Sequence, residues 1–296
     1  MQVGYMPVGL GVLAQPDAIV EVAQSAEELG FHSLWVGDHA FFPESFTSPY
    51  PYSSGGQFPE AVLKTDFLDP FVALGFMAAH TTRLRLGTGV CILGERNPLT
   101  TAKAAASVDR LSKGRLDFGI GIGWLREEYE ALGVPWPRRA QRTEEYLELI
   151  KRLWAEEKTA FSGEFCSFPT LYSYPKPVQK PHPPIIFGGG SAAALRRAAR
   201  LGDGWYGMES TVEETIAQTA EFRSYAAEFG RNPDSLHVSM ALRPDIRLDA
   251  DALKRLADGG VHQVILRAFA PTAQEIIRTL ETLSRDIVEV SARVGS

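Results

Sequence analysis

Short apolar segments alternate with longer segments of helical periodicity along almost the whole chain. The first pair is V-G-Y-M-P followed by residues 16–29, where apolar residues recur at the spacing of one helix face: Ile19, Val22, Ala23, Ala26 and Leu29. Gly30 stands where a glycine commonly ends a helix. The next apolar run, S-L-W-V at 33–36, predicts a buried strand.

The same alternation continues through the rest of the sequence. Six further apolar runs predict strands: L-R-L-G-T-G-V, R-L-D-F-G-I-G-I-G, P-I-I-F, G-W-Y-G, H-V-S-M-A and Q-V-I-L. Helices are predicted from about Asn97-Pro98, over about 139–154, 191–201, 211–229 and 249–258, and over a last segment carrying Ile276, Leu280, Leu283 and Ile287 on one face. Segments of about 38–68 and 158–184 are too long for simple connections and predict functional insertion loops.

Eight strand–helix units without a break in composition predict a single α/β domain over residues 1–296, folded as a (β/α)8 TIM barrel. A doubly wound open sheet has the same local pattern. The length of the chain and the lack of a linker between units favour the barrel.

The composition is that of a soluble globular protein, with 45% hydrophobic and 22% charged residues. A net charge of −6 without a basic block argues against binding of nucleic acid or an anionic membrane. The sequence shows neither a signal peptide nor an apolar stretch of membrane-spanning length, so we expect a cytoplasmic protein. The two cysteines and six histidines have no metal-ligand spacing, so no metal site is expected.

Asp38 and His39 directly follow the second predicted strand. Catalytic groups of TIM barrels lie at the C-terminal ends of the strands, so this pair falls on the expected active face. We interpret His39 as the chemical group. Asp38 either orients the imidazole or caps the turn.

Three glycine-rich strand ends accompany this pair. Glycines in the run from Gly87 let the backbone approach a flat ligand or form a bulge. The run from Gly119 has Trp124 where a dinucleotide fingerprint needs its third glycine. In F-G-G-G-S-A-A, the backbone N–H groups of Gly189, Gly190 and Ser191 open a helix and predict a phosphate-binding nest. With so few catalytic side chains, a cofactor is expected to carry the chemistry.

Four segments together resemble the bacterial luciferase-like flavin and deazaflavin superfamily. They are G-F-H-S-L-W-V-G-D-H, L-G-T-G-V-C-I-L, P-P-I-I-F-G-G-G-S and the long run R-N-P-L-T-T-A-K-A-A-A-S-V-D-R-L-S-K-G-R-L-D-F-G-I-G-I-G-W-L-R-E-E-Y-E-A-L-G-V. The similarity is greatest to the branch that uses coenzyme F420, a 5-deazaflavin. It implies a luciferase-like barrel with insertion loops, and a homodimer.

The resemblance also implies roles for individual residues. It places a non-proline cis peptide bond between Gly89 and Val90, behind the cofactor ring, and makes His39 the acid or base. The other cofactor contacts that it implies are Asp38, Ile122, Gly123, Trp124, Gly189, Gly190 and Ser191. Trp124 replaces a glutamate of the related sugar-phosphate dehydrogenases, so that reaction is not expected.

The predicted function is hydride transfer between F420 and a small, fairly apolar organic substrate, with His39 or water supplying the proton. One alternative is an FMN-dependent monooxygenase that uses reduced flavin and oxygen. A second is a flavin-binding protein without turnover. Because F420 carries an anionic tail, we expect several basic residues to line a groove from the nest: Lys64, Arg126, Arg138, Arg139, Lys176 and Lys180.

Overall fold

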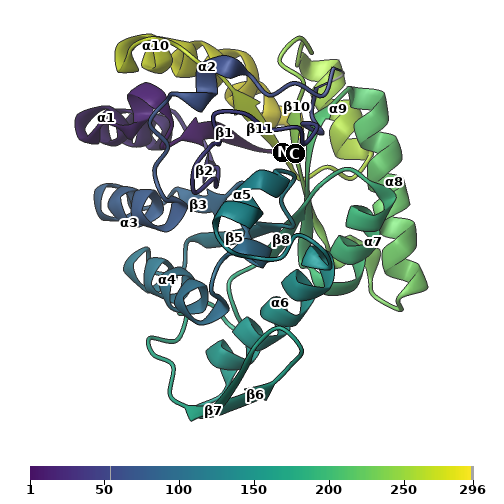
Figure 1. Cartoon of the computed structure of the whole chain (residues 1–296). Coiled ribbons are helices and arrows are strands. Elements are labelled where there is room, and N and C mark those ends of the chain that lie inside the picture. The colour runs from purple at the N-terminus through teal and green to yellow at the C-terminus, as the bar shows by residue number, and fades with distance from the viewer. Residues whose placement is uncertain (54, 295–296) are drawn as a thin grey trace.

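Eight parallel strands close into a barrel in the computed structural model, which describes residues 1–53 and 55–294 (Figure 1). The strands follow the order β1, β2, β3, β5, β8, β9, β10 and β11, and the β11–β1 and β3–β5 pairings complete the ring. In the first of these pairings Gln2 lies opposite Gln263, and in the second Leu86 lies opposite Leu116. The predicted fold class is confirmed.

The barrel strands are β1 (Gln2–Val8), β2 (Ser33–Val36), β3 (Arg85–Thr88), β5 (Leu116–Gly121), β8 (Ile185–Gly188), β9 (Gly204–Ser210), β10 (His237–Leu242) and β11 (Gln263–Arg267). A two-residue strand, β4 (Cys91–Ile92), continues the line of β3 and also pairs with β5. The peptide bond between Gly89 and Val90, which separates β3 from β4, is cis, as the resemblance implies.

The helices form the outer layer of the molecule. They are α1 (Pro16–Glu28), α2 (Glu60–Leu63), α3 (Pro70–His80), α4 (Pro98–Leu111), α5 (Arg126–Ala131), α6 (Arg139–Ala155), α7 (Ala192–Leu201), α8 (Val212–Glu228), α9 (Ala250–Asp258), α10 (Ala273–Leu283) and α11 (Glu289–Val294). Local signals set several boundaries: Asp69, Asn97 and Ser191 accept hydrogen bonds from the first helical N–H groups, and Gly30 has a φ of +82° after α1. The sequence patterns did not predict α3 or α5.

Two hydrophobic layers hold the barrel together. The larger lies between the strands and the outer helices and includes Leu34, Leu86, Phe118 and Val264. The smaller fills the inside of the barrel and consists of Met6, Trp35, Ile186, Tyr206, Ala241 and Ile265, with Val90 and Met208 packed against it. Because side chains fill the barrel, ligands have access only from its ends.

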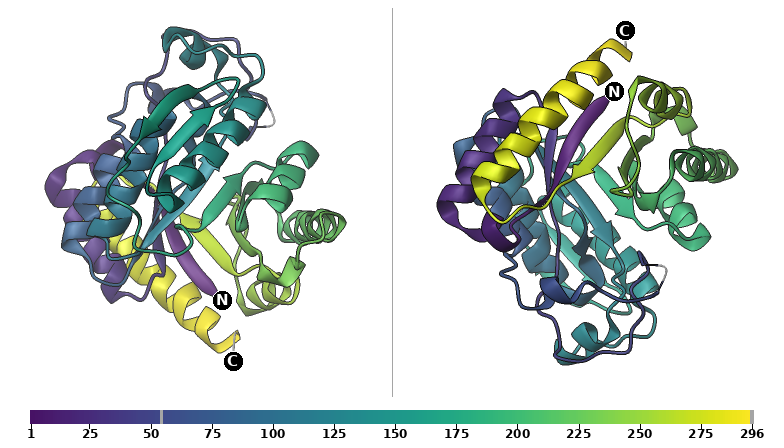
Figure 2. Two further views of the ribbon diagram at one scale, coloured as in Figure 1. Left: turned by 90° about the horizontal axis from the view of Figure 1, so that it is seen from below. Right: turned by 90° about the horizontal axis from the view of Figure 1, so that it is seen from above.

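Both predicted insertions contain structure of their own. The second one carries the antiparallel hairpin β6 (Thr159–Ser162) and β7 (Ser167–Leu171), which projects at the bottom of Figure 1. The first one runs from β2 to α3 and contains α2. The two ends of the chain lie close together, since the amino group of Met1 donates to the carbonyl of Ser291 (3.2 Å; Figure 2).

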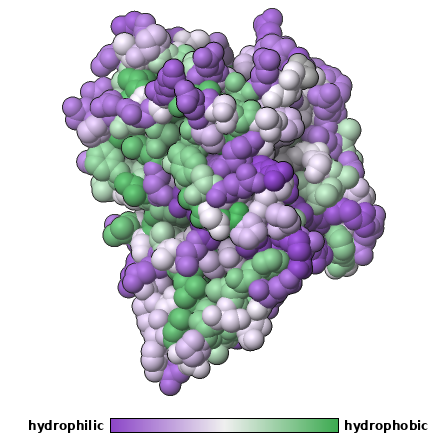
Figure 3. Space-filling view, in the orientation of Figure 1, coloured by the Kyte–Doolittle hydropathy of each residue, from purple (hydrophilic) through white to green (hydrophobic). Residues whose placement is uncertain are grey.

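Polar and apolar residues are mixed over the face shown in Figure 3. Hydrophobic side chains gather at the left of this view, over α3, where Val72 and Phe76 are exposed. Within the described part of the chain, every helix is too short or too polar to cross a bilayer.

Candidate functional site at the C-terminal end of the barrel

His39 is held in place by a glutamate that the sequence reasoning missed. The His39 Nδ1 lies 2.8 Å from Oε2 of Glu128, on α5, and the side chain of Glu128 is almost fully buried. A carboxylate accepts hydrogen bonds, so Nδ1 donates to it and Nε2 is the nitrogen left for a ligand. The pair thus fixes both the direction and the tautomer of the imidazole.

Two consecutive glutamates of α5 attach the first insertion to the barrel. Oε1 of Glu128 accepts from the N–H of Ala40 (2.6 Å). Glu127 accepts from the N–H of Thr47 (2.8 Å) and from the hydroxyl of Ser48 (2.7 Å). Burial raises the pKa of Glu127, but these hydrogen bonds outweigh it and lower the pKa to about 2. The segment after His39 is therefore fastened at two points.

Asp38 has a different role from His39. Its buried carboxylate accepts from the Arg96 guanidinium at 2.5 and 2.8 Å and from the N–H of Ile92 at 2.9 Å. Arg96 also donates to Asp69 at the start of α3 (2.9 Å). The interpretation that Asp38 orients His39 is therefore wrong, because Glu128 does so. The carboxylate has no exposed surface, so the predicted cofactor contact of Asp38 could come only from its backbone.

An aromatic cluster surrounds the imidazole, and we define it as Phe42, Phe46, Tyr50, Phe58, Phe67 and Trp124. The rings of Phe42, Trp124 and Phe67 have their centroids 4.5, 5.8 and 6.0 Å from that of His39. Phe58 stacks on Trp124 at 5.4 Å. Five of the six come from the first insertion, so this loop forms an apolar wall around His39.

The same insertion extends across the barrel mouth. Burial raises the pKa of Tyr50 to about 12, with further contributions from Tyr52 and from the carboxylate of Glu209. Glu209, at the end of β9, forms an ion pair with Arg267 at the end of β11. β11 lies opposite β5 in the ring, and β9 lies two strands away from β5. A loop that meets both Trp124 and Glu209 therefore covers part of the opening between these strands. Figure 1 shows this dark blue segment passing from α2 toward β10.

The glycines of β3 and β5 serve the protein's own packing. A Cβ atom on Gly87 would lie 2.4 Å from the Trp35 ring, and one on Gly119 would lie 1.9 Å from the carbonyl oxygen of Thr88. A Cβ on Gly121 would meet Val90 at 2.6 Å. In the run from Gly87 the bulge is confirmed: Leu86 pairs with Leu116 and Cys91 with Ile120, so this strand has one residue more than β5. Gly87 leaves no room for a ligand, whereas Gly89 and Val90 remain partly exposed at the mouth.

The predicted phosphate nest is present in part. Gly189 has a φ of +113°, and its N–H donates to the carbonyl of Tyr206 (3.3 Å), so this group is not free. The N–H groups of Gly190 and Ser191 have no acceptor among the described residues, and they stand at the start of the ten-residue helix α7. A Cβ on Gly190 would approach only Nε2 of Gln218, at 3.4 Å. An anion can reach these two N–H groups, so the residues present fit a cofactor phosphate.

The six basic residues do not form the expected groove. Lys176 and Lys180 precede β8 and therefore lie at the opposite end of the barrel, where their amino groups donate to the carbonyls of Leu153, Glu156 and Pro177. Arg126 and Arg138 form surface ion pairs with Glu130 and Glu164. The side chain of Lys64 makes no hydrogen bond or ion pair with another described residue.

Arg139 is the basic residue with an unused donor. Its Nε is buried and has no hydrogen-bond partner among the described residues. Its guanidinium lies 3.7 Å from the centre of the Trp136 ring. Burial, Arg197 and Arg142 lower the pKa of Arg139, which indicates local positive charge around the first turn of α6.

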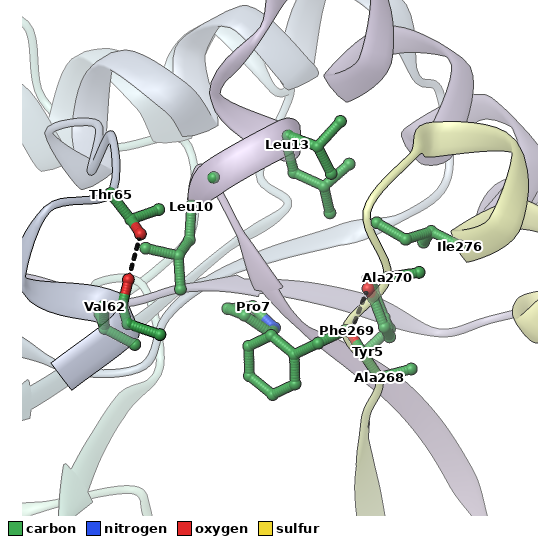
Figure 4. A pocket seen from close by; sticks show the side chains of 13 residues that line it. Tyr5, Pro7, Leu10, Leu13, Val62, Thr65, Ala268, Phe269, Ala270 and Ile276 are labelled. Atoms are coloured by element: carbon green, nitrogen blue, oxygen red, sulfur yellow. Dashed lines mark hydrogen bonds between the residues drawn. The ribbon is translucent and has the colours of Figure 1, made fainter. Parts of the chain in front are cut away.

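Two cavities open at this end of the molecule. One, of about 470 Å³, reaches His39 from the outer side and is lined by residues of α3, α4 and the turn after β4. The other, of about 190 Å³, lies beside the ends of β1 and β11 and has the mainly apolar lining drawn in Figure 4, with Leu10, Val62 and Thr65 on one side and Ala270 and Ile276 on the other. The mouth thus has an apolar recess near the barrel and a polar one behind His39.

The functional residues that sequence reasoning missed are carboxylates and their partners, namely Glu95, Arg96, Glu128, Glu209 and Arg267. One signal could have revealed Glu128: it follows Leu125 by three positions and precedes the buried Tyr129, so a charged residue occupies the apolar face of a helix. Glu209 and Arg267 stand at strand ends, where the same reasoning used for His39 applies.

Comparison with known proteins gives consistent results. A model of the luciferase-like monooxygenase family matches residues 3–286. An uncharacterised protein of Mycobacterium tuberculosis is 34% identical over 266 residues, which cover 88% of this chain and 91% of that protein. The FMNH(2)-dependent dimethylsulfone monooxygenase of Pseudomonas putida is 33% identical over 157 residues, covering 52% and 43%. An F420-dependent secondary alcohol dehydrogenase, solved in complex with an F420-acetone adduct, has a TM-score of 0.75 at 18% identity over 98% of both chains.

Proposed function

The chain belongs to the luciferase-like monooxygenase family, and we propose that within it this protein transfers hydride from reduced coenzyme F420 to a small, fairly apolar organic substrate. The observation that carries the proposal is the His39–Glu128 pair inside the aromatic cluster. A hydride acceptor also needs a proton, and an imidazolium whose Nδ1–H is bound by Glu128 is suited to donate its Nε2 proton at a water-poor mouth.

The residues at the mouth have separate roles in this reaction. The N–H groups of Gly190 and Ser191 and the guanidinium of Arg139 hold the phosphate groups of the cofactor, and Val90 supports its ring. When bound, the cofactor supplies the hydride. Glu128 holds the His39 ring, and Nε2 of His39 delivers the proton to the substrate atom next to the carbon that accepts the hydride. The apolar recess near Phe269 takes the apolar part of the substrate.

Both classes of cofactor occur among the similar proteins, since the dehydrogenase is named for F420 and the sulfone monooxygenase for FMNH(2). An FMN-dependent monooxygenase is therefore the second candidate, and the 33% sequence identity of this chain to the sulfone monooxygenase over 157 residues supports it. The positive charge that Arg139 shares with Arg142 and Arg197 favours F420, which has a phosphodiester and a glutamate tail where FMN has only a phosphate.

Titration of the protein with reduced F420 and with reduced FMN, at several salt concentrations, tests the choice. F420 affinity should be greater and should fall more steeply with salt, because more charge pairs form along its tail. Substrate turnover should consume no oxygen. Tighter binding of FMN with an equal salt dependence, and oxygen consumption coupled to turnover, would establish the monooxygenase instead.

Arg139 and Arg138 provide a matched pair of variants for the same titration. Arg139→Gln should weaken F420 binding by about 5- to 30-fold, the loss of one charge-assisted contact, and weaken FMN binding less. Arg138→Gln removes the same charge one residue away, where Glu164 already pairs with it, and should leave both affinities unchanged. An equal effect of the two variants would remove Arg139 from the site.

A further inference from the structure

A polar cavity lies behind His39, on the side facing away from the barrel axis. It holds about 470 Å³ and is lined by His39, Glu95, Arg96, Asn97, Thr100 and Leu132, among others. The side chain of His39 keeps 11% of its surface exposed, and Nε2 makes no hydrogen bond to a described residue. On the mouth side, the rings of the aromatic cluster pack around the imidazole. Water therefore has a route to His39 through this cavity.

Glu95 is the unusual group of this cavity. The residue is only 7% exposed, and its Oε2 is buried without a hydrogen-bond partner among the described residues. A buried carboxylate without partners is costly when ionised but acceptable when it carries a proton. The surroundings of Glu95 thus select the protonated acid.

The charges around Glu95 act in the same direction. Burial raises its pKa most, the carboxylates of Glu128 and Asp38 raise it further, and Arg96 only partly opposes them, so that the pKa is about 9. Arg96 is already engaged by Asp38 and by Asp69, which also lines the cavity. Tyr129, on α5, also faces Glu95, and burial and then the Glu95 carboxylate raise the pKa of its hydroxyl. Glu95 therefore holds a proton at neutral pH within a carboxylate cluster that ends at His39.

We propose that Glu95 is a proton relay that returns to His39, through water in this cavity, the proton that His39 gives to the substrate in each turnover. The proposal rests on the function proposed above. As hydride reaches the substrate carbon, the imidazolium loses its Nε2 proton to the substrate and stays as the neutral ring, with Nδ1–H donating to Glu128. The carboxylic acid of Glu95 then passes its proton along cavity water to Nε2 as it takes another proton from solvent, so that Glu95 is not left as a free carboxylate in the cluster. No electrons move in this return step.

Glu95→Gln separates this role from a structural one. At neutral pH an amide matches the protonated acid in shape and charge, but it cannot give up a proton in the relay. The variant should therefore fold, bind cofactor and complete a single turnover as the wild type does, while steady-state turnover falls by about 10- to 100-fold, the lower part of the range for acid–base groups. Small buffer acids such as imidazole, which fit the cavity, should restore steady-state turnover in proportion to their concentration. Glu130→Gln, the same change on the exposed face of α5, is the matched control and should change neither rate.

A second readout works without cofactor or substrate and so distinguishes failure of the relay from failure of the proposed function. The exchange of the His39 imidazole protons with water, measured by ¹⁵N NMR, should be slowed at least several-fold in Glu95→Gln and unchanged in Glu130→Gln. The urea midpoint of Glu95→Gln should also exceed that of the wild type at pH 8 and by less at pH 5. The reason is that the wild-type unfolded chain releases the Glu95 proton above pH 4.5, whereas the folded protein retains it up to about pH 9.

Equal His39 exchange in Glu95→Gln and the wild type would overturn the relay, whatever the activity of the enzyme. A loss of single-turnover rate equal to the loss of steady-state rate would likewise overturn it and make Glu95 a positioning residue. Slowed exchange in a protein that shows no F420 turnover would support the relay and reject the hydride-transfer function.

Discussion

Both ends of the barrel contain histidines, but the hydrogen-bond partners of their ring nitrogens are of opposite kinds. At the C-terminal end, Nδ1 of His39 faces the carboxylate of Glu128. At the N-terminal end, Nδ1 of His262 accepts from the N–H of Val238 (3.0 Å), and the ring stacks on His237 at 4.9 Å. The carboxylate thus makes Nδ1 of His39 a donor, whereas the Val238 N–H makes Nδ1 of His262 an acceptor and requires that ring to be neutral.

The other polar groups at the two ends of the barrel also differ. The N-terminal end is closed by hydrogen bonds between buried neutral groups, such as Gln263 with Ser33 and Ser239, and by the ion pair of Arg85 with Asp117. The C-terminal end has a carboxylate with an unused oxygen, Glu95, two arginines with an unused donor, Arg139 and Arg267, and two cavities. The N-terminal end also keeps two atoms without a partner among the described residues, Gln2 Oε1 and Arg223 Nε, so it is the cavities, together with the unpaired groups, that leave the C-terminal end able to bind and react.

The largest expected effect comes from removing the active-face imidazole. His39→Ala should lower turnover by roughly 10²–10⁴-fold with little change in cofactor affinity, because only the proton donor is lost. Steady-state kinetics with a verified substrate, together with cofactor titration, measure both quantities. His80→Ala at the exposed end of α3 is the control. Unchanged turnover in His39→Ala would reduce His39 to a wall residue and remove the contrast between the two ends.

The histidines of the N-terminal end should instead govern stability in acid. Burial and then His262 lower the pKa of His237 to about 4. Below pH 6.5 the His237 ring binds a proton in the unfolded chain but not in the folded protein. This group alone should therefore lower the free energy of unfolding by about 3 kcal/mol between pH 6.5 and pH 4. Urea unfolding over this range measures the loss. In His237→Gln the pH dependence should be shallower; an unchanged slope would show that His237 is not the group responsible.

Glu128→Gln tests whether the partner of His39 matters for its tautomer. The amide can still accept from Ala40 but can equally present its NH₂ group to the ring, so the proton on Nδ1 is no longer fixed. We expect turnover to fall by about 10- to 100-fold with the Michaelis constant nearly unchanged. The ¹⁵N shifts of His39 should show a mixture of tautomers, and a single tautomer with full activity would contradict the assignment.

The smallest effect is expected at the nest. Gly190→Val should weaken cofactor binding by about 10-fold, because a branched side chain stands in front of the free N–H groups while the backbone there accepts any residue. Gly189→Val is the contrasting variant: with a φ of +113° and Ala194 only 3.0 Å from the new Cβ, it should destabilise the fold itself. Cofactor titration and thermal unfolding of both variants separate the two effects. Full affinity in a folded Gly190→Val protein would move the phosphate elsewhere.

Local sequence signals predicted the barrel and most of its helices correctly. The stripe in α1 ends at Gly30, and the glycines and serine before α7 mark the start of that helix, because caps and periodicity depend on neighbours a few residues apart. The helices α3 and α5 could not be predicted in this way. α3 is apolar almost all round and α5 has only six residues, so neither shows a clear apolar stripe.

The position of Asp38 and His39 at a strand end could be predicted from the sequence, but their separate tasks could not. Successive residues point in opposite directions along extended backbone, and the partner each one meets comes from a distant segment: Arg96 for Asp38 and Glu128 for His39. The packing role of Gly87, Gly119 and Gly121 could not be predicted for a related reason, since the Trp35, Thr88 and Val90 atoms that occupy their space belong to other parts of the barrel.

By itself, the sequence determined the eight-fold alternation, the active end of the barrel and the glycines that can admit a phosphate, because each depends on spacing along the chain. Only the tertiary structure decided which carboxylate holds His39, which arginines keep an unused donor and why Glu95 retains its proton. These properties depend on burial and on distances between side chains far apart in sequence, and the closure of the barrel alone creates both.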